Sequence, residues 1–184
     1  EKDPNNVVDG FNIYRETTNY GVFELVTSQP YSQESVYIDN AASPVDRSWR
    51  YFISTYDACS ESYGSFIHKT IHIVEVSNNG SDVNIAWDDY EGITYASIDL
   101  LRFDETNGWQ IVANLPIGTN NYTDTPPVFV GLDYMISFNL ASPCTSTKAQ
   151  DHNASRSNTS SSTFDLPATA LPNLEKKLVF VFSK

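Results

Sequence analysis

Basic residues are scarce in this sequence. It has 11 Lys and Arg against 23 Asp and Glu, which gives its 184 residues a formal net charge of -12 at pH 7. A surface of this sign repels phosphate backbones and anionic lipid headgroups. The charge therefore argues against binding to nucleic acid or to a membrane surface, and it is typical of a soluble protein.

Long apolar runs are also absent. No stretch approaches the roughly 18 apolar residues of a membrane span, so we expect no membrane insertion. The first residues, Glu1-Lys2-Asp3-Pro4, are not followed by the apolar stretch of a signal peptide. If the protein is secreted, we expect this sequence to represent its mature or trimmed form.

Cysteine is rare, and sustained helical periodicity is missing. Two cysteines, Cys59 and Cys144, cannot form a disulfide framework, and neither has a second cysteine nearby with which to bind a metal. Short runs of Val, Ile, Thr and aromatic residues alternate with turn residues. Together with the missing helical periodicity, this pattern favours an all-β fold. We expect strands within 11–15, 23–26, 35–39, 49–56, 67–76, 83–87, 97–102, 109–113, 121–124 and 134–138.

An internal repeat is the strongest signal. Five features of the first half recur in the same order about 85 residues later: an apolar pair followed by Arg, a four-residue strand with a following Pro, a Tyr-x-Asp, a Tyr-x-Ile-Ser and a Cys. The matched anchor residues are Arg15 with Arg102, Pro30 with Pro116, Asp39 with Asp124, Tyr51 with Tyr134, and Cys59 with Cys144. Matches that recur in the same order indicate duplication. The small changes in spacing from one match to the next fall between strands, in loops.

The first copy of the repeat is incomplete. Two predicted strands, 67–76 and 83–87, precede Arg102, but only a short loop-like stretch precedes Phe11. We therefore expect either that the sequence begins within a domain or that a partner segment supplies the missing strands. Residues 148–162 predict an edge strand that runs into a flexible linker, and the apolar run 177–182 predicts a final strand that needs a partner.

The ordered residues resemble the fibronectin type III family of immunoglobulin-like β-sandwiches. Trp87 matches its core tryptophan, residues 95–102 its third strand, and 121–124 and 132–138 its later Tyr-containing strands. Residues 10–16 resemble segments of tandem modules in large secreted bacterial surface proteins. The resemblance implies a module at 1–66 that lacks its N-terminal strands, a complete module at 67–160, and a linker with a C-terminal strand at 161–184.

Few residues suggest chemistry. His68 and His72 lie four apart on a predicted strand, about 13 Å from each other, so one metal ion cannot bridge them; we expect partly exposed side chains near the module junction. Asp88, Asp89 and Glu91 offer the oxygen ligands that calcium prefers, but not the spacing of a dedicated calcium loop. We therefore expect a solvated loop, with calcium binding as the alternative, and we predict no metal site and no cofactor.

No catalytic motif is present. The sequence has no nucleophile elbow, and neither cysteine has a histidine close to it in sequence. We expect no enzyme activity. We also expect free or externally paired thiols, because Cys59 and Cys144 lie a full module apart in an extended tandem.

The resulting prediction is a non-catalytic structural or adhesion spacer in a larger secreted or cell-surface protein, with other domains or surface proteins as partners. One alternative is a carbohydrate- or ligand-binding accessory module of a secreted enzyme, with Tyr90 and Trp109 as candidate binding residues. The other is an assembly subunit in which the apolar strand at 177–182 completes the open module of its own or a neighbouring chain.

Overall fold

The protein is all-β. The structure, a computed structural model, describes residues 8–34, 36–62, 64–79, 81–126, 131–144, 152–162 and 179–181. These residues form strands without a helix, and all strand pairs are antiparallel. No helix that could cross a membrane occurs in these ranges.

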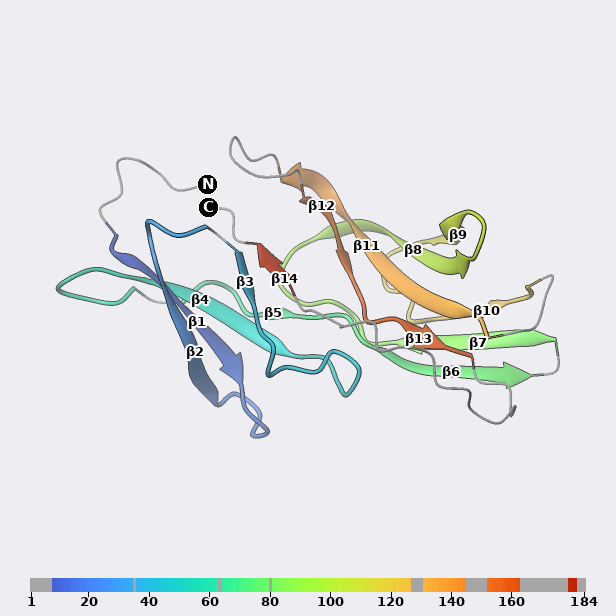
Figure 1. Ribbon diagram of the computed structural model, residues 1–184, viewed down its shortest axis with the longest axis horizontal. Helices are drawn as coiled ribbons and strands as arrows, with labels where there is room; N and C mark the ends of the chain where they lie inside the picture. Colours follow the sequence, from blue (N-terminus) through green and yellow to red (C-terminus); the bar gives the residue numbers. More distant parts are fainter. Residues whose placement is uncertain are drawn as a thin grey trace.

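Residues 8–69, the N-terminal half, form one main sheet with the order β2-β1-β4-β5 and one separate strand, β3 (Figure 1). The strands are β1 (Gly10–Glu16), β2 (Phe23–Pro30), β3 (Val36–Ile38), β4 (Arg50–Tyr56) and β5 (His68–Lys69). Strand β3 pairs with β14 (Val179–Val181), from the far end of the chain.

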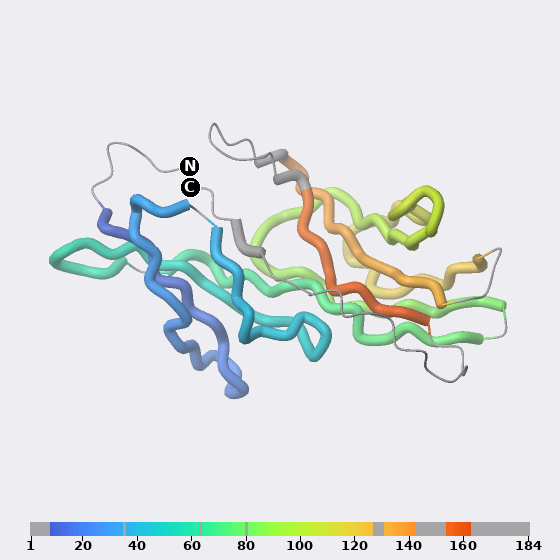
Figure 2. Tube along the Cα trace, viewed as in Figure 1, coloured from blue at the N-terminus to red at the C-terminus, as the bar shows by residue number. Residues whose placement is uncertain are grey.

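The described residues from 71 to 162, the C-terminal half, form two sheets. One has the order β10-β7-β6; the other has the order β12-β11-β8-β9, with β13 also on β11. The Cα trace follows both halves from blue to orange (Figure 2). The strands are β6 (Ile73–Asn79), β7 (Asp82–Trp87), β8 (Tyr95–Asp104), β9 (Gly108–Leu115), β10 (Asn121–Asp124), β11 (Asp133–Cys144), β12 (His152–Arg156) and β13 (Ser160–Ser161).

The two sheets of the C-terminal half enclose one apolar core, as in a β-sandwich. In β7 every second residue is buried, which follows from the two-residue period of a strand. Residues from β7, β8 and β11 meet between the sheets, and a fully buried Ile or Phe contributes about 1.5–3 kcal/mol. The central members are Val83, Ile85, Trp87, Ile98, Leu100, Tyr134, Ile136 and Phe138. The all-β prediction is thus confirmed.

The core of the N-terminal half is much smaller. Its buried cluster contains Ile13, Ala42 and Tyr51, with Tyr37, Trp49 and Ile53 packed against it. The difference follows from the sheets: within the described residues, β3 and β14 are the strands opposite β2-β1-β4-β5, whereas a three-stranded sheet fills that place in the other half.

The same three polar side chains recur in both halves. In the N-terminal half, Asp39 accepts hydrogen bonds from Arg15 at 2.9 Å and from the Tyr51 hydroxyl at 3.0 Å.

In the C-terminal half, Asp124 accepts them from Arg102 at 2.5 Å and from the Tyr134 hydroxyl at 2.8 Å. These are the residues that the sequence repeat aligns, so the two halves share their internal geometry as well as their strand order.

Two sequence predictions about strand extent are wrong. Residues 67–76 do not form one strand: β5 ends at Lys69 and pairs with β4, and β6 begins at Ile73 and pairs with β7. The edge strand predicted within 148–162 does not run into a linker at residue 161, because β13 follows β12 along the edge of β11 and includes Ser161.

Asn158, between β12 and β13, fixes this edge to the opposite sheet. Its buried side-chain oxygen accepts a hydrogen bond from the backbone N–H of Ile73 at 2.8 Å. Residues 163–178, the rest of the predicted linker, lie outside the described ranges. The division of the chain at residues 66 and 160 stays a prediction.

Candidate functional site

The two halves meet at the segment that joins β5 to β6. The backbone N–H of Thr70 donates to the carbonyl of Trp49 at 2.9 Å, and the Thr70 hydroxyl accepts from the N–H of Trp49 at 2.9 Å. Two residues later, the carbonyl of His72 accepts from the N–H of Asp88 at 2.8 Å. The segment is therefore bonded on one side to the N-terminal half and on the other to the C-terminal half.

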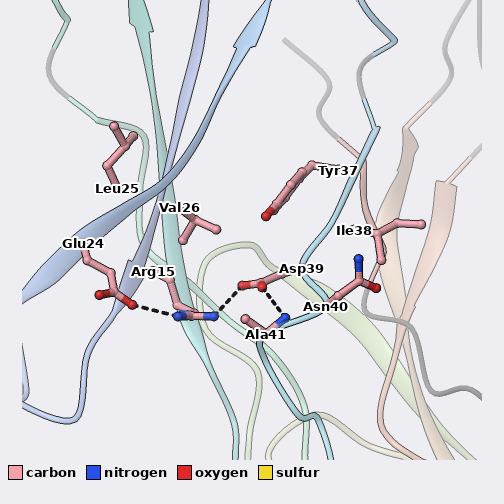
Figure 3. A pocket seen from close by; sticks show the side chains of 9 residues that line it. All are labelled: Arg15, Glu24, Leu25, Val26, Tyr37, Ile38, Asp39, Asn40 and Ala41. Atoms are coloured by element: carbon pink, nitrogen blue, oxygen red, sulfur yellow. Dashed lines mark hydrogen bonds and ion pairs between the residues drawn. The ribbon is translucent and has the colours of Figure 1, made fainter.

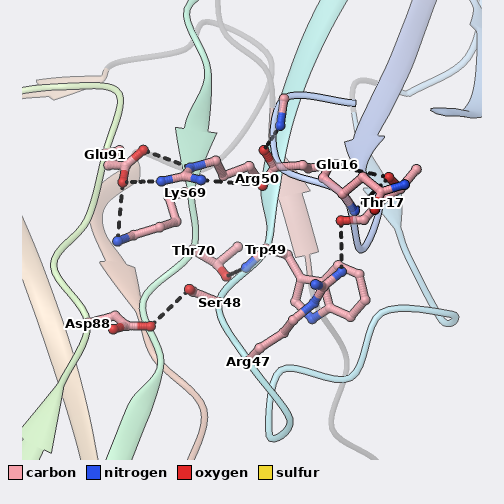
Figure 4. Close-up of polar contacts among 12 residues, drawn as sticks. Glu16, Thr17, Arg47, Ser48, Trp49, Arg50, Lys69, Thr70, Asp88 and Glu91 are labelled. Carbon is pink, nitrogen blue, oxygen red and sulfur yellow. Dashed lines mark hydrogen bonds and ion pairs between the residues drawn. The ribbon is translucent and has the colours of Figure 1, made fainter. Parts of the chain in front are cut away.

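Glu91 is the centre of the ion pairs at this junction (Figure 4). Its carboxylate accepts two hydrogen bonds from the Arg50 guanidinium, at 2.8 and 3.0 Å, and lies 3.3 Å from the Lys69 ammonium. Arg50 also reaches Glu16 in β1, at 3.4 Å. A bidentate guanidinium–carboxylate pair fixes orientation as well as distance, which a single contact does not.

The pKa values of this group follow from these contacts. The hydrogen bonds from Arg50, and then those from Lys69, lower the pKa of Glu91 below its ordinary value. The hydrogen bond to Glu91 raises the pKa of Arg50 further above an already high value. The pairs are therefore charged throughout the neutral range.

The histidines lie at the junction as predicted, but they do not face each other from one strand. His68 is in β5, and its Nδ1 lies 2.7 Å from the Tyr90 hydroxyl; burial lowers its pKa. His72 follows β5 in the connecting segment, and its Nε2 lies 2.9 Å from the carbonyl oxygen of Val45. The expectation of partial exposure is wrong for His72, which is buried between the two halves.

Gly92 is required by the same packing. Its backbone has a φ of +126°, and a Cβ atom there would lie 2.4 Å from Nδ1 of His68. Both the conformation and the space are therefore restricted to glycine. The residue keeps the loop of Glu91 close to β5, where Lys69 and Glu91 also share backbone pairing.

The predicted acidic cluster does not converge on one point. Asp88 accepts a hydrogen bond from Ser48 at 2.9 Å, Asp89 accepts one from Tyr95 at 2.7 Å, and Glu91 is paired with Arg50. Within the described residues, no group of three His, Cys, Asp or Glu could hold a metal ion. Two of the three carboxylates, Asp88 and Glu91, bind side chains of the N-terminal half.

The two candidate binding aromatics do not form a platform. Tyr90 is directed into the core, where burial raises its pKa to about 12 and its ring lies 6.3 Å from Phe138. Trp109 in β9 contacts Phe103 edge-on, at 5.4 Å and an interplanar angle of 65°. A sugar-binding platform needs exposed, coplanar rings, and Tyr90 and Trp109 do not provide them.

A cavity of about 530 Å³ lies between β2 and β3 in the N-terminal half (Figure 3). Its charged side chains bind one another: Arg15 donates to Asp39 at 2.9 Å and to Glu24 at 2.7 Å. The remaining walls are mostly apolar, from Leu25, Val26, Ile38 and Ala41 among others. Because its charges are paired internally, the cavity offers no free acid–base couple.

The cysteine prediction is tested in part. Cys59 is exposed and forms no disulfide bond. Cys144 ends β11, and its side chain lies outside the described part of the structure.

Sequence reasoning missed the basic partners of the junction. Arg50 and Lys69 lie in separate strands, far in sequence from Glu91, so no local motif joins them. The available signal was weak: Arg47-Ser48-Trp49-Arg50 brings two of the few arginines together at the start of a strand.

Trp49 also orders this stretch. Arg47 lies over its ring at 3.9 Å from the centroid, and Arg15 lies over it at 5.0 Å. Such cation–π contacts contribute about 0.5–2 kcal/mol.

Comparisons of the whole chain with models of known protein families and with curated proteins give no match.

Proposed function

We propose that this chain is a non-catalytic spacer of a larger secreted or cell-surface protein, built from two fibronectin type III-like modules. Its role is geometric: it holds a binding or catalytic domain at a set distance and direction from an anchor. The observation that carries this proposal is the Glu91 carboxylate, which contacts Arg50 and Lys69 of the N-terminal half together.

The strand order supports the type of module. The pair of sheets β10-β7-β6 and β12-β11-β8-β9 has the arrangement expected of a fibronectin type III-like sandwich, with Trp87 in its core. The order β2-β1-β4-β5 in the N-terminal half corresponds to β9-β8-β11 and its edge strand.

The junction supports the spacer role. Modules that only share a flexible linker move independently, because few contacts cross such a boundary. Here backbone hydrogen bonds, a bidentate ion pair and the buried His72 all cross it. A connection of this kind resists bending, which a spacer requires.

The carbohydrate-binding alternative has less support. A carbohydrate-binding role depended on Tyr90 and Trp109, and Tyr90 is turned inward. The proposed partners are therefore other domains of the same polypeptide or surface proteins, and the proposed location is extracellular.

The rotational motion of the two halves in solution tests the proposal. We expect ¹⁵N relaxation to give one rotational diffusion tensor for the described residues of both halves. Glu91→Ala removes the ion pairs at the centre of the junction, so we expect separate correlation times for the halves. Glu105→Ala, in the exposed turn between β8 and β9, is the matched control and should behave as wild type. Independent motion in the wild-type protein would contradict the spacer proposal.

A further inference from the structure

Strand β3 has a partner from the opposite end of the chain. Val36, Tyr37 and Ile38 pair in antiparallel register with Val181, Phe180 and Val179. Figure 1 shows β14, in red, beside β3. The pair forms a sheet of its own, and Tyr37 of β3 packs against the cluster of Ile13, Ala42 and Tyr51.

The C-terminal half shows what this position means. There β10 pairs in antiparallel register with β7, and Tyr122 lies opposite Ile85. Strands β3 and β10 are equivalent. Asp39 directly follows β3 and Asp124 ends β10, and each binds the matching Arg and Tyr of its own half. Tyr37 therefore corresponds to Tyr122, and Phe180 takes the register position of Ile85.

The equivalent strand β7 is part of the core of its sandwich. Val83, Ile85 and Trp87 alternate along it and are 1–3% exposed, so they supply a large share of the core. The small cluster of Ile13, Ala42 and Tyr51 has no such contribution from its own neighbouring sequence within the described residues. An apolar strand placed on β3 fills the corresponding position.

We propose that the edge of β3 is a binding site for an extended apolar peptide, and that residues 179–181 of the same chain are its resident ligand. Main-chain hydrogen bonds to β3 provide the affinity, and an apolar residue opposite Tyr37 provides the selectivity. The proposal does not depend on the spacer role, because it concerns how the N-terminal half is completed.

The site is tested by replacing the resident strand with a free peptide. In the full chain, Phe180→Asp places a charge at the position of Ile85 and should release β14. A labelled synthetic peptide of residues 174–184 is then titrated by fluorescence anisotropy. We expect the peptide to bind the variant and raise its Tm. We expect its affinity for the wild-type chain to be lower by about tenfold or more, because the tethered strand competes. The same peptide with Phe180→Asp is the control and should not bind.

Failure of the wild-type peptide to bind the variant, or a variant Tm equal to that of wild type, would contradict the proposal. A second experiment remains informative even if the variant misfolds. Ile38→Cys and Val179→Cys are combined in a chain with Cys59→Ser and Cys144→Ser, and oxidised.

An internal disulfide supports the proposed resident strand. A disulfide-linked dimer would show that the strand of a second copy occupies the site, which overturns the proposed occupant. No disulfide of either kind would overturn the site itself.

Discussion

At the scale of single residues, each half contains one buried aspartate that binds an arginine and a tyrosine from other strands. Asp39 is 1% exposed and Asp124 is 7% exposed, and each carboxylate lies between a guanidinium and a tyrosine hydroxyl. A buried carboxylate is costly unless its oxygens are paired, so the arginine and the tyrosine are both needed. Burial is the largest cause that raises the pKa of Tyr51 and of Tyr134, and the aspartates add to it, so both hydroxyls stay protonated and donate.

Tyr134→Phe tests the value of one such bond. The substitution leaves the ring in the core but removes the donor to the Asp124 carboxylate. We expect the free energy of unfolding to fall by about 1.5–3 kcal/mol, the usual loss for a hydrogen bond to a charged group. Chemical denaturation measures it, with Tyr122→Phe as the control, expected to change stability by about 0.5 kcal/mol or less. Equal effects of the two substitutions would contradict this account.

These aspartates also show what the sequence could predict. The repeat aligned Arg15, Asp39 and Tyr51 with their counterparts without any knowledge of their contacts, because the duplicated pattern survives in the residues that bind one another. The acidic loop gave the opposite result. Three carboxylates close in sequence predict a shared cation, but each takes a different partner, and two of the partners, Ser48 and Arg50, come from a segment remote in sequence.

At the scale of elements, most strands were predictable and the break between β5 and β6 was not. Apolar alternation continues from Ile67 to Val76, so nothing local ends the strand. The break occurs because the backbone of Thr70 bonds to Trp49 and that of His72 to Asp88, which are contacts between distant segments. The edge strand itself was predicted, but its continuation as β13 was missed for a related reason: the serines there resemble a linker, whereas β11 supplies their pairing.

Ile71 anchors the connection between β5 and β6. It is 2% exposed and belongs to the core of the C-terminal half, although it lies in no strand. Ile71→Ala should therefore lower the free energy of unfolding by about 2–5 kcal/mol. Val74→Ala, in β6 and 53% exposed, is the matched control and should cost about 0.5 kcal/mol or less. Urea unfolding compares them, and a small effect at Ile71 would show that this segment does not depend on the core.

At the scale of the whole molecule, the junction makes the relation of the two halves depend on pH. Hydrogen bonds from Arg50 hold the folded-state pKa of Glu91 below its unfolded value, so the unfolded chain binds more protons as the pH falls. The stabilisation is present above the ordinary glutamate pKa of about 4.3 and is lost as the pH falls through the lower folded-state value.

We expect the single rotational diffusion tensor of the wild-type protein to be lost on acidification through this window. Glu91→Gln should remove this part of the pH dependence, because its amide does not titrate. Relaxation measurements at pH 7 and in steps below about pH 4.5 follow the change. A wild-type junction that stays rigid while Glu91 becomes protonated would contradict the role given to this ion pair.

The pairing of β14 with β3 also sets an order of events during synthesis. The C-terminal half is continuous in sequence, with its core complete by about residue 138, whereas β3 must wait for a strand made about 140 residues later. At translation rates of about 5–20 residues per second, that delay is roughly 7–28 s. The half that the ribosome starts first is therefore finished last, and a nascent chain carries it as an open sheet while the later half folds ahead of it.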